Sequence, residues 1–199
     1  MKKNLVLILL LVSFVSNAQK SAEDEPKGNV VFKSNTPEEG GKSKLISYSG
    51  FAVEYVIPNY SSSLENNAFT SSGFAINIEA YRPLSKKIAL ATNVSFVFLD
   101  QLRNEEFNLG LYFILLKGFY VKPQVGIGFY GSGDKGVQDY LTSTFNYTLR
   151  GQAGYLFKIG GSGNKQSFLD LGFALHTINN PILTTNYYGI SLKYLWGTK

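Results

Sequence analysis

The chain has 199 residues, no cysteine, one histidine and a formal net charge of +5. The lack of cysteine excludes disulfides and thiol chemistry, and a single histidine argues against a multi-histidine metal site. The cations are scattered, so no basic patch predicts nucleic-acid binding. Charged residues make up 17% of the chain and aromatic residues 15%, which suits a sheet whose outer surface does not face water.

The first residues have the pattern of a secretory signal peptide. Two lysines form a basic head, residues 5–15 form an apolar run, and small residues follow up to Ala18. The run is shorter than the roughly 20 residues that a membrane-spanning helix needs. We therefore expect residues 1–18 to be a signal peptide that is cleaved after Ala18. Residues 19–43 are polar with mixed charge, and we expect a flexible periplasmic leader.

Residues 44–199 repeat one pattern eight times. In each segment large apolar residues alternate with small or polar ones, which is the period of a β-strand with two different faces. The eight segments are residues 45–58, 73–81, 88–98, 107–116, 119–130, 145–159, 168–178 and 187–197. No segment has a helical period of comparable strength, so the sequence predicts an all-β fold with eight strands.

The connections between the segments differ in length. Long polar stretches, residues 59–72 and 131–144, join the first to the second segment and the fifth to the sixth, whereas most other joints are shorter. The tightest joint, residues 117–119, predicts a three-residue turn in which Gly118 has a positive φ. Long loops at one end, short turns with both termini at the other, and an even strand number are typical of outer-membrane barrels.

The composition of the two faces predicts which face meets lipid. A soluble barrel would have Lys, Glu and Thr on its outer face. Here the minor face is mostly Gly, Ala, Asn and Ser, which fit the narrow interior of an eight-stranded barrel. The major face is nearly uncharged, with aromatic residues such as Tyr188 and Trp196 near the strand ends. We therefore predict an eight-stranded antiparallel transmembrane β-barrel. Pro123 cannot donate to the ladder, so we expect it at a strand start or a bulge.

With this pattern the chain resembles the small outer-membrane β-barrel family of Gram-negative bacteria, which includes the membrane domain of outer membrane protein A. The resemblance covers residues 44–197 and is most specific in the last strand. There the family's assembly signal is matched by Tyr187, Gly189, Leu192, Tyr194 and Trp196. The resemblance implies an outer-membrane location with periplasmic termini, contacts with outer-membrane lipid and lipopolysaccharide, and insertion by the barrel assembly machinery. The resemblance does not indicate which extracellular partner the protein binds.

Charged residues on the minor face are predicted to point into the lumen. A narrow, dry lumen draws opposite charges together, because an unpaired buried charge is strongly unfavourable. We predict a lumen charge network of Glu54, Glu79, Lys122, Arg150, Asp170, His176 and Lys193. Asp170 and Lys193 lie on neighbouring strands and are expected to pair directly, and Lys158 is assigned to the same face. Such a network would plug the barrel.

Two sequence motifs suggest alternative functions. Residues 126–131 read GIGFYG, but no helix follows as a dinucleotide site requires, so these glycines are assigned to the lumen face. The sequence HTINNP, which starts at His176, resembles the His-x-Ser-Asn stretch of outer-membrane lipid A deacylases. However, Ile178 replaces the serine, and no Asp or Glu follows Asp170. A hydroxyl nucleophile needs a base and an orienting group.

These observations favour a non-enzymatic outer-membrane barrel with a structural, envelope or surface-interaction role and no cofactor or metal. The alternatives are transport of small or apolar molecules and, less favoured, lipid A modification. A carrier would have a lumen cavity or a gap in the wall. An enzyme would have His176 beside both a hydroxyl and a carboxylate.

Overall fold

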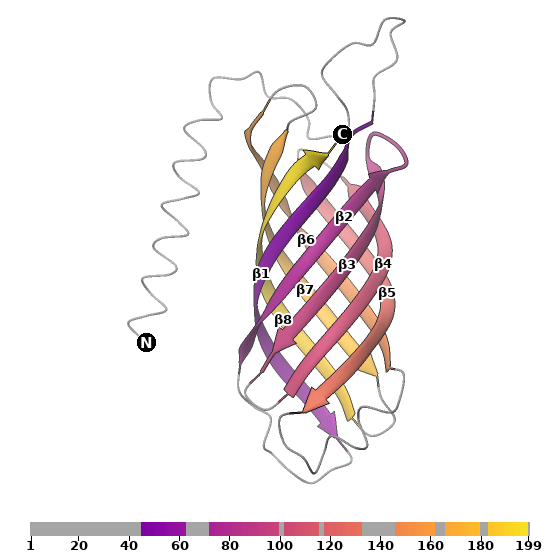
Figure 1. Ribbon diagram of the computed structural model, residues 1–199, viewed down its shortest axis with the longest axis vertical. Helices are drawn as coiled ribbons and strands as arrows, with labels where there is room; N and C mark the ends of the chain where they lie inside the picture. The colour runs from indigo at the N-terminus through magenta and orange to yellow at the C-terminus, as the bar shows by residue number, and fades with distance from the viewer. Residues whose placement is uncertain are drawn as a thin grey trace, which may run out of the picture.

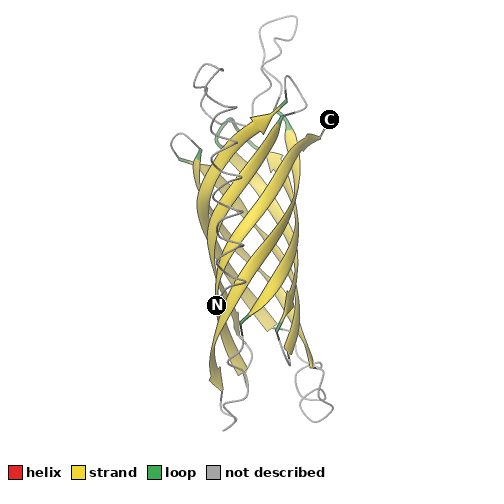
Figure 2. Ribbon diagram, turned by 90° about the vertical axis from the view of Figure 1, so that its left-hand side faces the viewer, coloured by secondary structure: helices red, strands yellow, loops and turns green. Residues whose placement is uncertain are grey.

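The computed structural model describes residues 45–62, 72–99, 102–115, 118–132, 146–161, 166–179 and 183–198. They form eight strands: β1 Ser47–Ser62, β2 Gly73–Pro83, β3 Ile88–Phe98, β4 Leu102–Ile114, β5 Phe119–Ser132, β6 Asn146–Gly160, β7 Ser167–Asn179 and β8 Leu183–Thr198. Each strand pairs with the next antiparallel, and β1 pairs with β8 to close a tilted barrel (Figures 1 and 2). The predicted eight-stranded antiparallel barrel is confirmed. The predicted signal peptide and leader lie outside the described residues.

The barrel has two different ends, to which we give fixed names. The terminal end carries the C-terminal end of β8 and the β2–β3 turn of residues 84–87. The distal end is the opposite one, where β1 and β5 finish. In the part of the chain that the structure describes, no helix is long and apolar enough to cross a membrane.

Several predicted boundaries were wrong, including that of β8, which begins at Leu183 rather than at residue 187. β4 begins at Leu102, five residues before the predicted start. β1 continues to Ser62, into the stretch that was assigned to a loop. Phe119 is the first residue of β5, not part of a three-residue turn, and Tyr120 pairs with Ile114. The positive φ predicted for Gly118 is confirmed at 97°. Residues 116–117 lie outside the described part of the chain.

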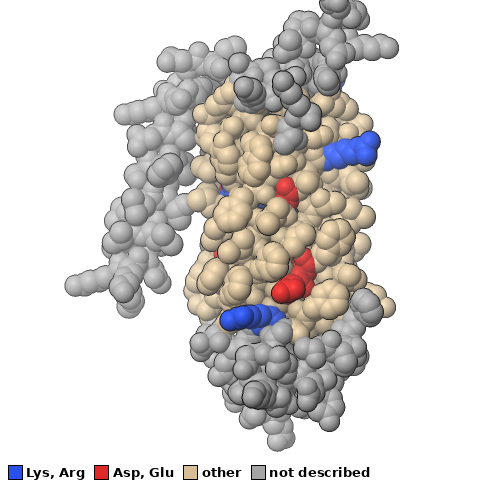
Figure 3. Space-filling view, in the orientation of Figure 1, with Lys and Arg blue, Asp and Glu red and all other residues tan. Residues whose placement is uncertain are grey.

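The barrel wall is apolar outside and closely filled inside. Burial alternates residue by residue along β3, and outward side chains such as Ile190 are 60% exposed. Aromatic pairs stand on the outer face near both ends: Tyr194 stacks on Trp196 at the terminal end, and Phe74 stacks on Phe98 at the distal end. Charged side chains are sparse on the described surface in Figure 3. An apolar belt between aromatic girdles is the exterior of a transmembrane barrel.

Pro123 lies inside β5 rather than at its start or at a bulge, so both expectations for this residue were wrong. The β4–β5 ladder pairs Gly110 with Gln124 and resumes at Phe113 and Val121 in the same register. The pairing is therefore interrupted where proline has no N–H to donate, without an extra residue in either strand. On its other side Pro123 pairs with Gly151 of β6.

Candidate functional site

A chain of alternating charges crosses the lumen toward the terminal end. Lys122 Nζ lies 2.7 Å from Glu79 Oε1, and Lys193 Nζ lies 2.8 Å from Glu79 Oε2. Lys193 Nζ also lies 3.0 Å from Asp170 Oδ2, across a direct Cα pairing between β7 and β8. These side chains are at most 1% exposed. We call these four residues the lysine cluster. The structure brings together the expected Asp170–Lys193 pair, and it adds Glu79 as a second partner of Lys193.

Tyrosines complete the lysine cluster. The Tyr81 hydroxyl donates to Glu79 and lies 3.0 Å from Lys193 Nζ. The Tyr120 hydroxyl donates to Asp170 Oδ1 at 2.8 Å, and Lys193 Nζ sits 5.6 Å from the Tyr120 ring centroid. Each phenol thus supplies a hydrogen bond to a carboxylate and a π-face to an ammonium group. These contacts replace the water that the charges lost on burial.

A second group of charges, the histidine cluster, lies nearer the distal end and consists of Glu54, Glu106, Arg150 and His176. Arg150 Nη2 is 2.7 Å from Glu54 Oε2. His176 lies between two carboxylates, with Nε2 at 2.9 Å from Glu54 Oε1 and Nδ1 at 3.4 Å from Glu106 Oε2. All four side chains are at most 1% exposed. These charges come from four strands, so the cluster cross-braces the barrel.

An asparagine ladder on β2, β3 and β4 joins the two clusters. Arg150 Nη1 donates to Asn77 Oδ1 at 2.7 Å. The Asn93 amide lies 3.3 Å from both Asn77 Oδ1 and Glu79 Oε1, so it links the histidine cluster to the lysine cluster. Asn108 extends the ladder by donating to Asn93 and, at 3.1 Å, to Glu106. An amide can donate and accept at once, which lets it connect groups of either charge. The lumen charges therefore form one network.

Apolar and aromatic side chains fill the lumen beyond the network at both ends. At the terminal end the filling consists of Ile46, Tyr48, Tyr81, Ala89, Ala91, Tyr112, Ile114, Tyr120, Leu156, Phe168 and Leu195. At the distal end it consists of Val56, Ala75, Val97, Leu99, Tyr130, Ile178 and Tyr187. Hydroxyl and amide contacts tie the distal group together, since Tyr130 donates to Thr185 at 2.9 Å and the Asn104 amide contacts the Tyr187 hydroxyl.

The residues of the expected assembly signal divide between the two faces of β8. Leu192, Tyr194 and Trp196 lie on the outer face, while Tyr187 is buried in the lumen with its ring edge against His176. Gly189 also faces the lumen, where a Cβ atom would overlap the Glu54 carboxylate. Glycine at this position is therefore explained by packing inside the folded barrel. Recognition of the strand by the assembly machinery stays a prediction.

The sequence reasoning missed Glu106, and it assigned Lys158 to the lumen face. Glu106 was missed because the fourth segment was started at Phe107, although the alternation of Asn104, Glu106 and Asn108 was a usable signal. Lys158 pairs with Phe168, which is buried in the lumen, and Lys158 is itself half-exposed beside a register shift in β6.

The alternative motifs have structural explanations. A Cβ atom on Gly126 would overlap the Phe107 carbonyl, so the glycines of GIGFYG follow from close packing of the wall. Both ring nitrogens of His176 meet carboxylates, and the neighbouring hydroxyl, Thr177, lies on the other face and donates to Asn186 at 2.8 Å. Within the described strands and turns, no three His, Cys, Asp or Glu side chains are arranged to hold a metal ion.

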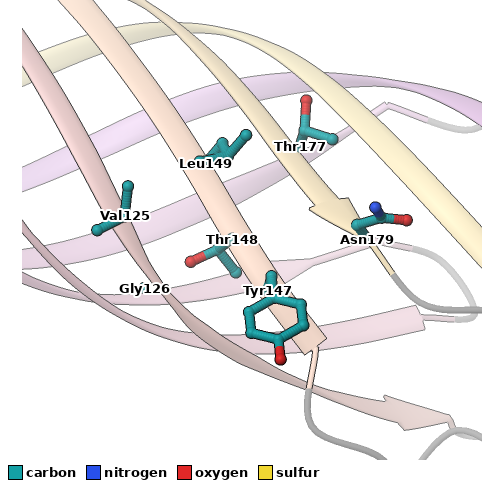
Figure 4. A pocket seen from close by; sticks show the side chains of 7 residues that line it. All are labelled: Val125, Gly126, Tyr147, Thr148, Leu149, Thr177 and Asn179. Carbon is teal, nitrogen blue, oxygen red and sulfur yellow. The ribbon is translucent and has the colours of Figure 1, made fainter.

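The outer wall has a recess of about 370 Å³ over β5, β6 and β7 toward the distal end (Figure 4). Its lining comprises Val125, Gly126, Tyr147, Thr148, Leu149, Thr177 and Asn179. Gly126 and Thr148 belong to the lumen face, so the recess reaches the main chain of the wall. Behind it the Thr148 hydroxyl donates to Asn108 at 2.6 Å, which places the recess next to the asparagine ladder.

No protein-family model and no curated protein matches the chain. Solved structures do match it. The crystal structure of Neisserial surface protein A is similar with a TM-score of 0.59 and 13% identity, over 76% of this chain and 97% of that one. The attachment invasion locus protein of Yersinia pestis has a TM-score of 0.47 and 12% identity, over 75% and 98% of the two chains. The outer membrane protein AlkL has a TM-score of 0.46 and 11% identity, over 83% and 96%. The first likeness shows that the chain has the fold of a small eight-stranded outer-membrane β-barrel.

Proposed function

We propose that this chain is a non-enzymatic outer-membrane protein with a closed lumen, which acts in envelope structure or in surface interactions rather than as a pore. The observation that carries the proposal is the continuous filling of the lumen. The lysine and histidine clusters occupy the middle, and apolar groups fill both ends. An eight-stranded barrel is only wide enough for its own side chains or one small ligand.

The proposed orientation places both termini in the periplasm. The signal-peptide pattern at the N-terminus supports export, and an even number of strands returns the C-terminus to the starting side. In this orientation the distal end faces outward, and the loops after β1 and β5 offer the surface for an extracellular partner. The outer face would contact phospholipid and lipopolysaccharide, and the barrel assembly machinery would insert the protein.

A second candidate function, transport of small or apolar molecules, is favoured by the recess on the outer wall. Its lining includes the outward residues Val125 and Leu149 and the lumen-face residues Gly126 and Thr148. A lateral route through the wall would have to displace Thr148 from Asn108. The lipid A deacylase alternative is weaker, because carboxylates contact both nitrogens of His176.

The test measures location and conductance in turn. The wild-type protein is expected to fractionate with the outer membrane, to migrate faster on a gel unboiled than boiled, and to give no steady conductance in a planar bilayer. The variant with Glu54→Ala and Arg150→Ala together removes an ion pair without leaving a lone charge, and it should raise conductance while keeping the gel shift. Recovery in the soluble periplasm would contradict the membrane assignment. Steady wild-type conductance, or swelling of liposomes in small sugars, would favour transport.

A further inference from the structure

The exposed charges of the barrel are distributed unevenly between its ends. Three cations are exposed at the terminal end: Arg82 near the end of β2, and Lys86 and Lys87 in the β2–β3 turn. The exposed pair Arg103 and Glu105 lies at the distal end of β4. Figure 3 shows a blue patch toward the upper end of the visible face, red and blue patches toward the lower end, and a small red patch between them. The other described carboxylates all belong to the lumen network: Glu54, Glu79, Glu106 and Asp170.

Within the described strands and turns, acids therefore do not match the three cations at the terminal end. Among the residues that the structure describes, none of the three makes an ion pair, and Glu105, the exposed carboxylate of this part of the chain, stands at the opposite end. The lumen carboxylates are engaged by Lys122, Lys193, Arg150 and His176. An uncompensated exposed cluster of one sign attracts counter-charges from its surroundings.

Hydrogen bonds from the main chain and from the Ser85 side chain hold the β2–β3 turn in a defined shape. The Ser85 hydroxyl accepts the N–H groups of Lys87 at 3.3 Å and Ile88 at 3.1 Å. The Leu84 N–H donates to the Ile88 carbonyl at 2.8 Å, and the neighbouring strand β4 donates to the Lys87 carbonyl at 2.8 Å. The cationic side chains therefore project from a fixed base.

The turn also lies at the edge of the apolar belt. Arg82 follows the outward residues Ile78 and Ala80 on β2 and pairs with Leu90, so it continues the outer face of β2 at the edge of the apolar wall. Leu84, at the tip of the turn, is 59% exposed. Long cationic side chains at such a boundary extend their charged groups to the headgroup level. An exposed leucine among cations suits an interface where acyl chains and charged headgroups meet.

We propose that the β2–β3 turn, with Arg82, Lys86, Lys87 and Leu84, is a docking surface for the headgroups of anionic phospholipids. The proposal rests on the membrane-spanning barrel proposed above, and it adds a lipid preference confined to the terminal end. The phosphate and negative charge of a lipid such as phosphatidylglycerol match three exposed cations, and Leu84 reaches toward its acyl chains. Each cation near an anionic membrane surface strengthens binding by about fivefold, since its contribution is about 1 kcal/mol.

The single tryptophan of the chain provides a reporter near this surface. Trp196 pairs with Ser49 of β1, which pairs with Ala80 of β2, so the indole is two strands away from β2 at the level just before Arg82. Two strand spacings are about 10 Å. Brominated lipids quench tryptophan on contact. Quenching of Trp196 by brominated phosphatidylglycerol, compared with brominated phosphatidylcholine, therefore measures local lipid preference.

The experiment uses the folded barrel in vesicles of phosphatidylcholine with a minor fraction of either brominated lipid. Wild-type protein should be quenched more by the brominated phosphatidylglycerol, and added salt should reduce the difference because it screens exposed charges. The Arg82→Gln/Lys86→Gln/Lys87→Gln variant should lose the difference. The matched control Arg103→Gln, at the distal end, should keep it. Soluble glycerol phosphate should not compete.

Equal quenching of the wild type by the two lipids would overturn the proposal, and so would an undiminished preference in the triple variant. Loss of the preference in Arg103→Gln would also overturn it. Competition by soluble glycerol phosphate would overturn it as well, because it would indicate a site for a free phosphate. The unboiled gel shift is measured on every sample. A barrel that keeps the shift but has no lipid preference contradicts only this proposal. A chain that does not insert at all contradicts the membrane assignment.

Discussion

Replacement of Lys193 by methionine tests whether the lumen network holds the barrel together. Methionine keeps much of the apolar stem of lysine and removes the ammonium group that Glu79 and Asp170 share at 2.8 and 3.0 Å. Glu79 keeps Lys122 at 2.7 Å, but Asp170 keeps only the Tyr120 hydroxyl among the contacts described for it. Breaking a buried ion pair by removing one partner costs about 3–5 kcal/mol. We expect Lys193→Met to lower the free energy of unfolding by that amount.

The measurement is urea unfolding of the barrel in phosphatidylcholine vesicles, monitored by Trp196 fluorescence and by the gel shift. The Asp170→Asn change removes the uncompensated charge and leaves an oxygen for the Tyr120 hydroxyl. The double variant should therefore be more stable than the sum of the single effects predicts, by about 1–3 kcal/mol. The surface control Lys86→Met should change stability by at most about 0.5 kcal/mol in this uncharged lipid. Strictly additive effects, or a loss below about 1 kcal/mol for Lys193→Met, would refute the buried network.

Two further predictions concern β8. Gly189→Ala should destabilise the barrel by about 1–3 kcal/mol in the same urea assay, because the added methyl group overlaps the Glu54 carboxylate. Gly151→Ala, where nothing lies within 4 Å of the added Cβ, should have little effect; equal losses in the two variants would contradict the packing argument. Tyr194→Asp combined with Trp196→Asp places charge on the lipid face and should abolish outer-membrane insertion, measured by fractionation. Normal insertion of that variant would show that neither the lipid-facing position nor the expected assembly signal matters.

The architecture was predictable because successive residues of a transmembrane strand face lipid and lumen in turn, so that two kinds of residue alternate in the sequence. Along β1 the alternation sets Phe51, Val53 and Tyr55 against Ala52 and Glu54, and the structure exposes the first group and buries the second. The period of two fixes the face of every residue once the lipid side is known. The lumen position of charges such as Glu79 and Lys193 followed from the same parity.

The composition of the lumen was harder to predict. Small residues were expected to fill it, yet Tyr48, Tyr81, Tyr112, Tyr120, Tyr130 and Tyr187 are all buried. The alternation shows that such a residue points into the lumen. It does not show whether the lumen has room for a tyrosine side chain, which depends on glycines in neighbouring strands. Gly154 and Gly172 leave room for the Tyr120 hydroxyl, because a Cβ atom on either would lie within 2.8 Å of it. Partners such as Arg150 and Asn77, which are 73 positions apart, depend on the rotation of the barrel and cannot be read from local spacing.

The charge count of the lumen supports the proposed closed state. The buried carboxylates are Glu54, Glu79, Glu106 and Asp170, and the buried lysine and arginine side chains are Lys122, Arg150 and Lys193. A neutral imidazole can donate at only one nitrogen, whereas the imidazolium form donates at both. Both His176 nitrogens face carboxylates, so the imidazolium satisfies both contacts and equalises the two signs. An interior in which opposite charges are paired attracts ions and water only weakly, and opening it would separate these pairs. Under the proposed closed-lumen function, the residues that stabilise this narrow barrel are therefore also expected to keep it from conducting.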